Sequence, residues 1–252
     1  MTAPFFLVEP AALRSRVGEI LSITGADGRH AATVKRLAVG EPVLVGDGAG
    51  RVVDGVVHEV VGRDQVDVQV VAYAEVAQPT PRLVVVQALA KGERSELSVE
   101  LLTEVGVDVI VPWSASRAVA QWRGEKSARG VEKWAVTARE ASKQARRPWV
   151  PDVRALTSTP EVVALVRSSV AGGGTAVVLH EAASLRMASL RIPVSGDVVL
   201  VVGPEGGISD EERALLEAAG ALSARLGPSV LRTSTAGTVA AAVVLASCGR
   251  WD

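Results

Sequence analysis

The pattern of hydrophobic positions changes about a third of the way along the chain. Before residue 77, valine-rich runs are short and interrupted by glycines, and residues 65–71 alternate between polar and apolar side chains. This alternation has the period of a β-strand with one buried face. Short strands with glycine turns predict a small β-barrel or sandwich. We also expect a strand at 5–9 and one helix over 27–39, with Asp27 as its cap.

Beyond residue 82, apolar strands alternate with helical patterns, which is typical of an α/β domain with a buried parallel sheet. Pro79 and Pro81 lack the backbone donor that a ladder needs, so we expect domains at 1–76 and 82–252 joined by a linker at 77–81. The expected strands are 83–89, 107–112, 175–180, 197–202 and 222–226, and the expected helices are 94–105, 125–147, 159–170, 209–219 and 235–248.

The helix expected at 235–248 contains no charged residue on any face. A helix that is apolar all round must be covered on all sides. Two arrangements satisfy this requirement: the helix lies deep inside its domain, or it pairs with a second subunit. The pattern alone leaves both open.

Composition excludes several classes of protein. A single cysteine, Cys248, rules out an intramolecular disulfide and a cysteine-cluster metal site, and it suits a reducing compartment. The first ten residues lack the pattern of a signal peptide, and no apolar run is long enough to span a membrane. We therefore expect a soluble, cytoplasmic protein that needs no metal and no membrane.

The net charge of −1 conceals a strongly basic segment. Residues 117–147 contain nine Lys or Arg and three Glu, a net +6, so the rest of the chain carries −7. Within this segment, Arg139, Lys143, Arg146 and Arg147 fall on one stripe of the expected helix. Such a stripe is either a solvated face or a surface that binds a polyanion, and the concentration of charge favours the polyanion.

Three strand ends carry the densest chemical signal. One strand runs into Gly203-Pro-Glu-Gly-Gly207, a second into Leu226-Gly-Pro and on to Leu231-Arg-Thr233, and a third into Leu179-His-Glu181. In open α/β sheets ligands bind beyond the carboxyl ends of strands, and glycines let a ligand approach the backbone. The turns match neither a Walker loop nor the dinucleotide fingerprint. If the three strands are neighbours, their ends form one crevice.

The pair of glycine–proline motifs resembles the SPOUT methyltransferases, in particular the ribosomal small subunit methyltransferase E family, which makes 3-methyluridine in 16S ribosomal RNA. The resemblance covers nearly the whole chain. It extends to 91–112, to the basic helix, and to an N-terminal PUA-like RNA-binding domain that carries His30 and Arg36. One position departs from the family pattern, because Ser234 replaces the usual glutamate, so no role for an acid is carried over there.

The resemblance implies a C-terminal trefoil knot whose loops hold S-adenosylmethionine (SAM). It also implies a homodimer with the site at the subunit seam, which favours the dimer interpretation of the last helix. The substrate would be 16S ribosomal RNA or the assembled small subunit. The residues expected to bind the cofactor are Leu179, His180, Glu181, Gly203, Pro204, Gly206, Leu226, Gly227, Leu231 and Thr233.

Methylation of uracil N3 requires loss of a weakly acidic proton, so a cation that stabilises the forming anion would accelerate it. Arg232 is the first candidate, against the alternative of a surface salt bridge. Glu205 would act as base or hold the substrate, or else accept helix amides, and His180 is either a base or simply packed. The expected RNA contacts are His30, Lys35, Arg36, Arg139, Lys143, Arg146 and Arg147.

Three other functions stay open at this point. One is a ribose 2′-O-methyltransferase of the same fold that acts on ribosomal or transfer RNA. Another is an RNA-binding protein without catalytic activity, an alternative that the Ser234 departure keeps in view. The third is an ordinary nucleotide-binding α/β protein, which the missing phosphate motifs argue against.

Overall fold

The computed structural model describes residues 3–251, which form two compact units. The first unit comprises the chain up to Gln78 together with Ser142–Val150, and the second comprises Pro79–Ala141 and the chain from Pro151 onward. The change of pattern at 77–81 therefore coincides with the step from one unit to the other. The return of 142–150 to the first unit was not expected from the sequence, which placed all of 82–252 in one domain.

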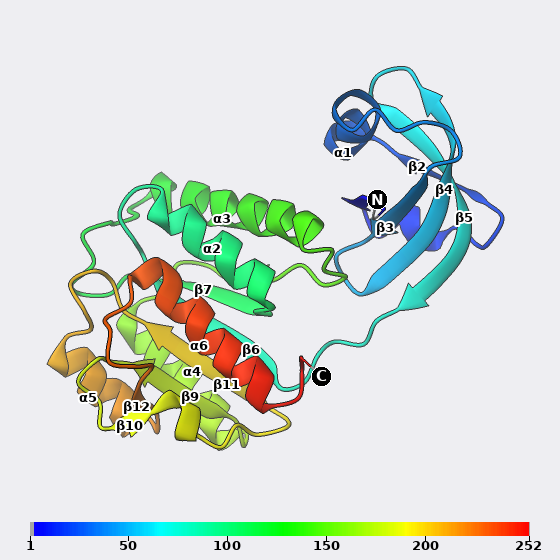
Figure 1. Cartoon of the computed structure of the whole chain (residues 1–252). Helices are drawn as coiled ribbons and strands as arrows, with labels where there is room; N and C mark the ends of the chain where they lie inside the picture. Colours follow the sequence, from blue (N-terminus) through cyan, green and yellow to red (C-terminus); the bar gives the residue numbers. More distant parts are fainter. Residues whose placement is uncertain (1–2, 252) are drawn as a thin grey trace. The chain divides into compact units, whose positions relative to one another are not determined.

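The first unit is built on a five-stranded sheet that curls around its own hydrophobic core (Figure 1). The strand order is β1-β3-β4-β5-β2, in which β1 and β3 run parallel and the other neighbours antiparallel. The predicted alternation is confirmed, since Val66, Val68 and Val70 are buried. The strands are β1 (Phe5–Leu7), β2 (Ile20–Ile23), β3 (Pro42–Gly46), β4 (Arg51–Val61) and β5 (Gln65–Glu75).

The helix expected over 27–39 is shorter and begins earlier. It consists of α1 (Gly25–Arg29) followed by a π-helical segment, η2 (His30–Val34), and a short 3-10 helix, η1 (Ala12–Arg14), precedes it in the chain. Asp27 lies buried in the first turn rather than at the cap, which is Thr24. The helix cannot continue to residue 39, because Arg36 has a φ of 54° in the left-handed region.

The second unit contains a seven-stranded sheet in which every neighbouring pair is parallel. Its strand order is β10-β12-β9-β11-β6-β7-β8. The five longer strands were predicted, whereas the two-residue edge strands β8 and β10 were not. The strands are β6 (Arg82–Ala88), β7 (Val109–Trp113), β8 (Asp152–Val153), β9 (Thr175–Leu179), β10 (Leu185–Arg186), β11 (Asp197–Val202) and β12 (Leu222–Arg225).

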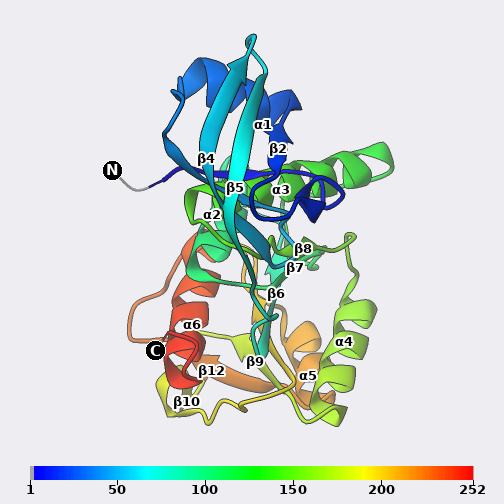
Figure 2. The same ribbon diagram turned by 90° about the vertical axis from the view of Figure 1, so that its right-hand side faces the viewer.

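Helices cover both faces of this sheet, as Figure 2 shows, so the strands are apolar on both sides. In β6, Leu83 and Val85 join the core beneath α2, α3 and α6, while Val84 and Val86 join the core beneath α4 and α5. The α/β prediction is thereby confirmed. The helices are α2 (Arg94–Val105), α3 (Glu125–Gln144), α4 (Thr159–Ala171), the 3-10 helix η3 (Met187–Ser189), α5 (Asp210–Ala218) and α6 (Thr233–Ser247).

The order of the sheet places the three motif-bearing strands side by side. Strand β9 lies between β12 and β11, and because the strands are parallel their carboxyl ends meet at one edge. This is the condition on which the single crevice depended. None of the helices within residues 3–251 is long and apolar enough to cross a membrane. The trefoil knot stays a prediction.

Candidate functional site

A cavity of about 480 Å³ lies at the carboxyl edge of the parallel sheet. A smaller cavity of about 80 Å³ shares several of its residues and extends to Leu226 and Gly227. The three predicted strand ends therefore converge on one region of the second unit. The predicted cofactor residues that line the larger cavity are Leu179, His180, Glu181, Gly203, Pro204, Gly206, Leu231 and Thr233, and both predicted catalytic residues, Glu205 and Arg232, line it too.

The turn after β11 requires its glycines for steric reasons. A Cβ atom on Gly203 would lie 2.7 Å from Cγ1 of Ile208, and one on Gly206 would lie 2.9 Å from the backbone oxygen of Arg117. Gly207 has a φ of 72°, which side chains rarely adopt. The turn thus folds closely on itself at Ile208 and packs against the segment that holds Arg117, and its residues line the cavity.

A hydrogen bond joins the two glycine–proline motifs directly. The Thr233 hydroxyl donates to the carbonyl oxygen of Gly203 at 2.5 Å. Behind this pair, the buried amide of Gln87 donates to Thr233 Oγ1 at 3.2 Å. Sequence reasoning missed Gln87, although a lone polar residue at the end of the apolar run in β6 was a signal. It ties the end of a fourth strand to the cavity wall.

Glu205 makes a contact that neither sequence interpretation anticipated. Its Oε1 accepts a hydrogen bond from the backbone N–H of Lys91 at 3.1 Å, which joins the glycine turn to the segment just before α2. The side chain is otherwise exposed, and its Oε2 has no hydrogen-bond partner within residues 3–251. One carboxylate oxygen therefore fixes the turn and the other faces solvent or a ligand.

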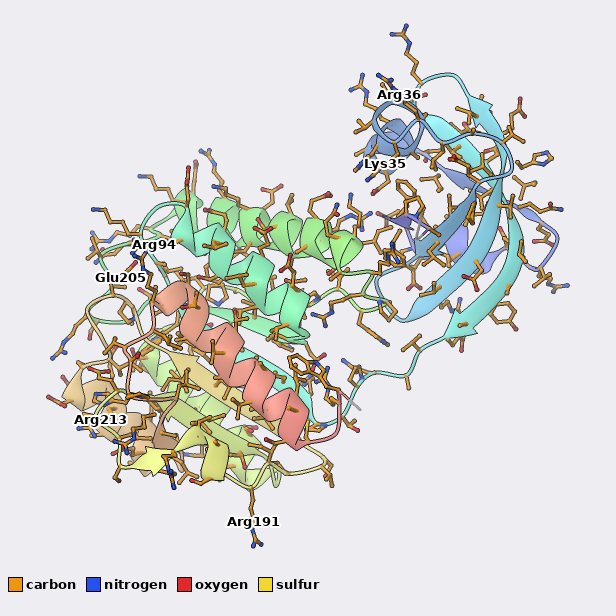
Figure 3. All side chains as sticks on the ribbon, viewed as in Figure 1. Lys35, Arg36, Arg94, Arg191, Glu205 and Arg213 are labelled. Carbon is orange, nitrogen blue, oxygen red and sulfur yellow. The ribbon has the colours of Figure 1, made fainter. Side chains whose placement is uncertain are left out.

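Three arginines line the larger cavity: Arg94 at the start of α2, Arg117 in the turn after β7, and Arg232 before α6. Within residues 3–251 none of their guanidinium groups makes a hydrogen bond or an ion pair. The alternative of a surface salt bridge for Arg232 finds no partner there. Figure 3 labels Arg94 and Glu205, which both line this cavity. The sequence drew attention to neither Arg94 nor Arg117 as a site residue.

Two further positions bear on the chemistry. The half-buried His180 lines the cavity, and its Nδ1 accepts the backbone N–H of Ala182 at 3.2 Å. Ser234, which replaces the family's glutamate, is buried in the first turn of α6 and is not part of the cavity lining. Ser234 therefore contributes no side chain to the wall of the cavity.

Glu212, in the first turn of α5, is buried close to this site without lining it. Burial alone would raise the pKa of its carboxyl group. Hydrogen bonds from the Ser116 backbone and hydroxyl, the Thr159 hydroxyl and the Ser209 backbone outweigh that effect and lower the pKa below its ordinary value. The carboxylate is therefore charged at neutral pH and holds three segments together.

The first unit gathers cations from both predicted RNA-binding patches. His30, Lys35 and Arg146 line one cavity of about 140 Å³ together with Phe5 and Phe6. The two patches, which are more than 100 residues apart in sequence, therefore share a surface of one unit. Figure 3 labels Lys35 and its neighbour Arg36.

Two arginines at this surface have unusual backbone conformations. Arg36 and Arg146 have φ angles of 54° and 52°, and they are the only residues other than glycine with positive φ in the described part of the chain. Such conformations cost free energy and tend to cluster at functional sites. Both side chains are exposed.

Lys143 does not fit its predicted role as an RNA contact. Its ammonium group lies 2.8 Å from Oδ1 of Asp27, and both side chains are more than 90% buried. A lysine held in this way has little surface to offer a phosphate, and its contact fastens the end of α3 to α1. Arg139 and Arg147 are half-buried and engaged within the protein. The exposed cations of the predicted set are Lys35, Arg36 and Arg146.

Comparisons with known proteins agree with this geometry. Residues 77–245 match the model of an RNA methyltransferase domain, and residues 23–71 match that of an RNA methyltransferase PUA domain. A Mycobacterium bovis protein named ribosomal RNA small subunit methyltransferase E is 45% identical over 235 residues, which cover 93% of this chain and 89% of the relative. A Bacillus subtilis protein of the same name is 27% identical and covers 85% of each chain.

Solved structures resemble the whole chain. A putative methyltransferase from Legionella pneumophila, solved with bound SAM, has a TM-score of 0.81 and 29% identity over 97% of each chain. A ribosomal RNA small subunit methyltransferase E from Neisseria gonorrhoeae, also bound to SAM, has a TM-score of 0.84. At 22% identity, this second likeness concerns the fold alone.

Proposed function

The chain belongs to the ribosomal RNA small subunit methyltransferase E family of RNA methyltransferases, and from this premise we propose that it transfers a methyl group from SAM to N3 of a uridine in 16S ribosomal RNA. The observation that carries the proposal is the convergence of three strand ends on one cavity that both glycine–proline motifs line. The named relatives are bacterial, and ribosomes lie in the bacterial cytoplasm, so we place the protein there.

The residues around the cavity suit SAM. A cavity of about 480 Å³ lies within the range of small-molecule sites. Backbone at Gly203 and Gly206 is open to close approach, while Leu179, Leu231 and Ala236 supply apolar surface for a base. When bound, SAM supplies an electrophilic methyl group, a chemistry that needs no metal. No cluster of His, Cys, Asp or Glu suited to a metal ion occurs in residues 3–251.

Two side chains at the cavity, Arg232 and Glu205, are assigned the catalytic roles. Uracil N3 becomes a good nucleophile only when its proton leaves. We assign stabilisation of the resulting anion to Arg232, which lines the cavity and whose guanidinium has no partner in the described residues. Glu205 is fixed through Oε1 and retains Oε2 to hold the substrate or accept the proton. Most of the rate enhancement then comes from positioning the reacting atoms.

The test is transfer of labelled methyl from SAM to 16S RNA from a strain that lacks the modification. Naked RNA and assembled small subunits are compared, and the RNA is digested to nucleosides. We expect N3-methyluridine. A ribose-methylated product would establish the 2′-O-methyltransferase alternative, and binding of both ligands without transfer would establish the non-catalytic one.

For RNA binding, the proposal rests on the exposed cations of the first unit. Lys35, Arg36 and Arg146 would contact phosphates, and His30 lines the same small cavity as Lys35 and Arg146. Phosphate contacts fix the position of a protein on nucleic acid without reading its sequence. These residues would therefore contribute affinity, while the choice of nucleotide is made elsewhere.

We further propose that two copies associate through α6. The helix carries no charge, and its buried side packs against α2 and β11, yet Val239 is 40% exposed and Ala246 is exposed as well. A second copy would cover this apolar strip. Val239→Asp should convert a dimer into monomers or insoluble protein, because an unpaired buried charge is costly. A wild-type chain that sediments as a monomer at micromolar concentration would contradict the proposal.

A further inference from the structure

The turn after β7 presents a single side chain to the cavity. Ala115 and Ala118 are buried in the core between the sheet and α4 and α5, and the N–H of Ala118 donates to the Ala115 carbonyl at 3.0 Å. Between them, Ser116 and Arg117 remain at the surface. Because both flanking residues are buried, the direction in which Arg117 projects depends on how Ser116 is held.

Glu212 holds Ser116 by two hydrogen bonds. The Ser116 N–H donates to Glu212 Oε1 and its hydroxyl donates to Oε2, both at 2.8 Å. The carboxylate is 96% buried, and its charge strengthens each bond. A serine held through backbone and side chain has little freedom, so the turn is fixed at its second residue.

The same carboxylate also secures the strand from which the turn begins. Thr159 donates its hydroxyl to Glu212 Oε1 at 2.9 Å and accepts the indole N–H of Trp113 at 3.2 Å. Trp113 is fully buried and is the last residue of β7. A chain of hydrogen bonds thus runs from the strand end through Thr159 to Glu212 and on to the turn.

Capping α5 does not require this network. A capping box needs only the reciprocal bonds between Ser209 and Glu212, which are present at 3.0 to 3.3 Å. The bonds to Ser116 and Thr159 are additional, and they explain why this glutamate is buried. The comparable box of α4, formed by Ser158 and Glu161, is exposed.

The turn after β7 packs against the glycine-rich turn that follows β11. A Cβ on Gly206 would lie 2.9 Å from the Arg117 carbonyl oxygen and 3.2 Å from its Cβ, so the backbone of Arg117 packs directly against the wall of the cavity. Arg117 lines that cavity, and its guanidinium has no hydrogen-bond or ion-pair partner within residues 3–251. The arginine fork matches the oxygens of a phosphate, and an RNA substrate brings phosphates to this entrance.

We propose that Arg117 binds a phosphate of the RNA beside the target nucleotide, and that Glu212 is the positioning residue that holds Arg117 there through Ser116. The inference rests on the proposed function, since it takes RNA as the substrate. The carboxylate of SAM is the other anion that Arg117 could hold, so the experiment measures the affinity for each ligand separately.

The experiment uses full-length protein and compares Arg117→Ala, Glu212→Gln and the double variant in steady-state methyl transfer. Losing one charged hydrogen bond to phosphate should raise the KM for RNA roughly tenfold in Arg117→Ala and reduce the salt slope of RNA binding by about one. Glu212→Gln should raise the KM several-fold, with kcat little changed. The double variant should have the KM of Arg117→Ala, because the positioning residue acts only through the arginine.

Two controls separate positioning from simple destabilisation. Ser209→Ala removes the cap of α5 but leaves the bonds to Ser116, so it should lower the melting temperature and leave the KM for RNA unchanged. Ser116→Ala removes only the hydroxyl bond from Ser116 to Glu212 and leaves the backbone bond, so it should raise the KM for RNA slightly. SAM affinity, measured by calorimetry, should stay the same in every variant.

Three results would overturn the inference: an unchanged KM for RNA in Arg117→Ala, effects of Arg117→Ala and Glu212→Gln that multiply in the double variant, or a loss of SAM affinity in place of RNA affinity. Failure of the proposed function itself is distinguishable, because the wild-type protein would then transfer no methyl group to any RNA.

Discussion

The two units present cations in different ways. In the second unit, Arg117 and Arg232 extend from turns that are fixed by buried hydrogen bonds, Glu212 to Ser116 in one case and Thr233 to Gly203 in the other. In the first unit, Lys35, Arg36 and Arg146 lie on an exposed surface, and two of them sit in left-handed backbone conformations. In the second unit, hydrogen bonds from other segments restrain the backbone that carries each arginine. In the first unit, the restraint comes from the local backbone conformation.

The difference indicates a division of labour. Stabilising charge that develops on one atom demands a cation held at one position, since small displacements cost rate. Attracting a polyanion demands only that charge be present near its backbone. We therefore expect substitutions in the second unit to affect turnover and those in the first unit to affect affinity and its salt dependence.

The largest expected effect is a loss of stability on substitution of Lys143, the buried cation of the first unit. Lys143→Met removes one charge of a buried ion pair with Asp27 and should lower the free energy of unfolding by about 3 to 5 kcal/mol. Lys133→Met is the matched control: its ion pair with Glu96 is also 2.8 Å long, but the lysine side chain is 66% exposed and the glutamate 27%, so its loss should cost less than about 1 kcal/mol. Chemical denaturation followed by circular dichroism measures both. A stable Lys143→Met protein with weakened RNA binding would restore Lys143 as an RNA contact.

Next in size is the rate effect of Arg232→Ala. Removing one group that stabilises a developing anion should slow single-turnover methyl transfer roughly a hundredfold, with SAM and RNA affinity little changed. Arg191→Ala is the control, because Arg191 is equally exposed but does not line the cavity (Figure 3). If Arg232→Ala weakens RNA binding and leaves the saturated rate intact, Arg232 is a docking residue and the catalytic assignment moves to Glu205.

The exposed cations of the first unit should show the opposite pattern. Lys35→Ala and Arg146→Gly should each weaken RNA binding several-fold and reduce the salt slope by about one, while the rate at saturating RNA is unchanged. Glycine is chosen at 146 because it accepts the positive φ without strain. Arg16→Ala, which removes an exposed charge outside this cavity, is the comparison. Equal salt slopes for all variants would show that RNA docks elsewhere.

The smallest expected effect is a change in the acid dependence of stability. Hydrogen bonds hold the pKa of Glu212 below its ordinary value of 4.5 despite burial, so its contribution is complete above that pH and is lost as the pH falls through the lowered pKa. Glu212→Gln should therefore flatten the acid limb of the melting temperature below about pH 4.5.

Glu161 provides a second test of how a lowered carboxyl pKa affects stability at low pH, and the expected change has the same direction. The Ser158 hydroxyl and backbone lower the pKa of this exposed carboxyl group, so Glu161→Gln should flatten the acid limb less than Glu212→Gln does. If the melting temperature falls with acid in the same way in wild type and Glu212→Gln, the hydrogen bonds of the Glu212 carboxylate add nothing to stability.

Local sequence signals accounted for most of the second unit. The apolar strands, the helix over 94–105 and the cap at Ser209 were predictable because burial on both faces and a capping box leave clear traces in a single segment. The convergence of the three glycine-bearing strand ends followed once their strands proved to be neighbours. The resemblance to a known family supplied the identities that periodicity cannot.

What the sequence did not reveal depends on partners far away in the chain. The spacing of Lys143 places it in the basic stripe. Its ammonium group is nevertheless buried, because it pairs with Asp27, which lies 116 residues away in the chain. Gln87 and Glu212 look like an ordinary strand end and an ordinary cap until their contacts with Thr233 and Ser116 are known. Arg36 ends its helix through a backbone conformation that no residue pattern specifies.

The segment 142–150 completes the first unit late in the synthesis of the chain. Pro148 and Val150 exchange backbone hydrogen bonds with Gly50 and Gly48, and the indole of Trp149 donates to the Val76 carbonyl at 2.9 Å. These contacts form only after residue 150 has left the ribosome, by which time β6, α2, β7 and α3 have already been made. The first unit can therefore finish folding only after much of the second has been translated, and a gene fragment that stops near residue 78 encodes a sheet without the segment that fastens it.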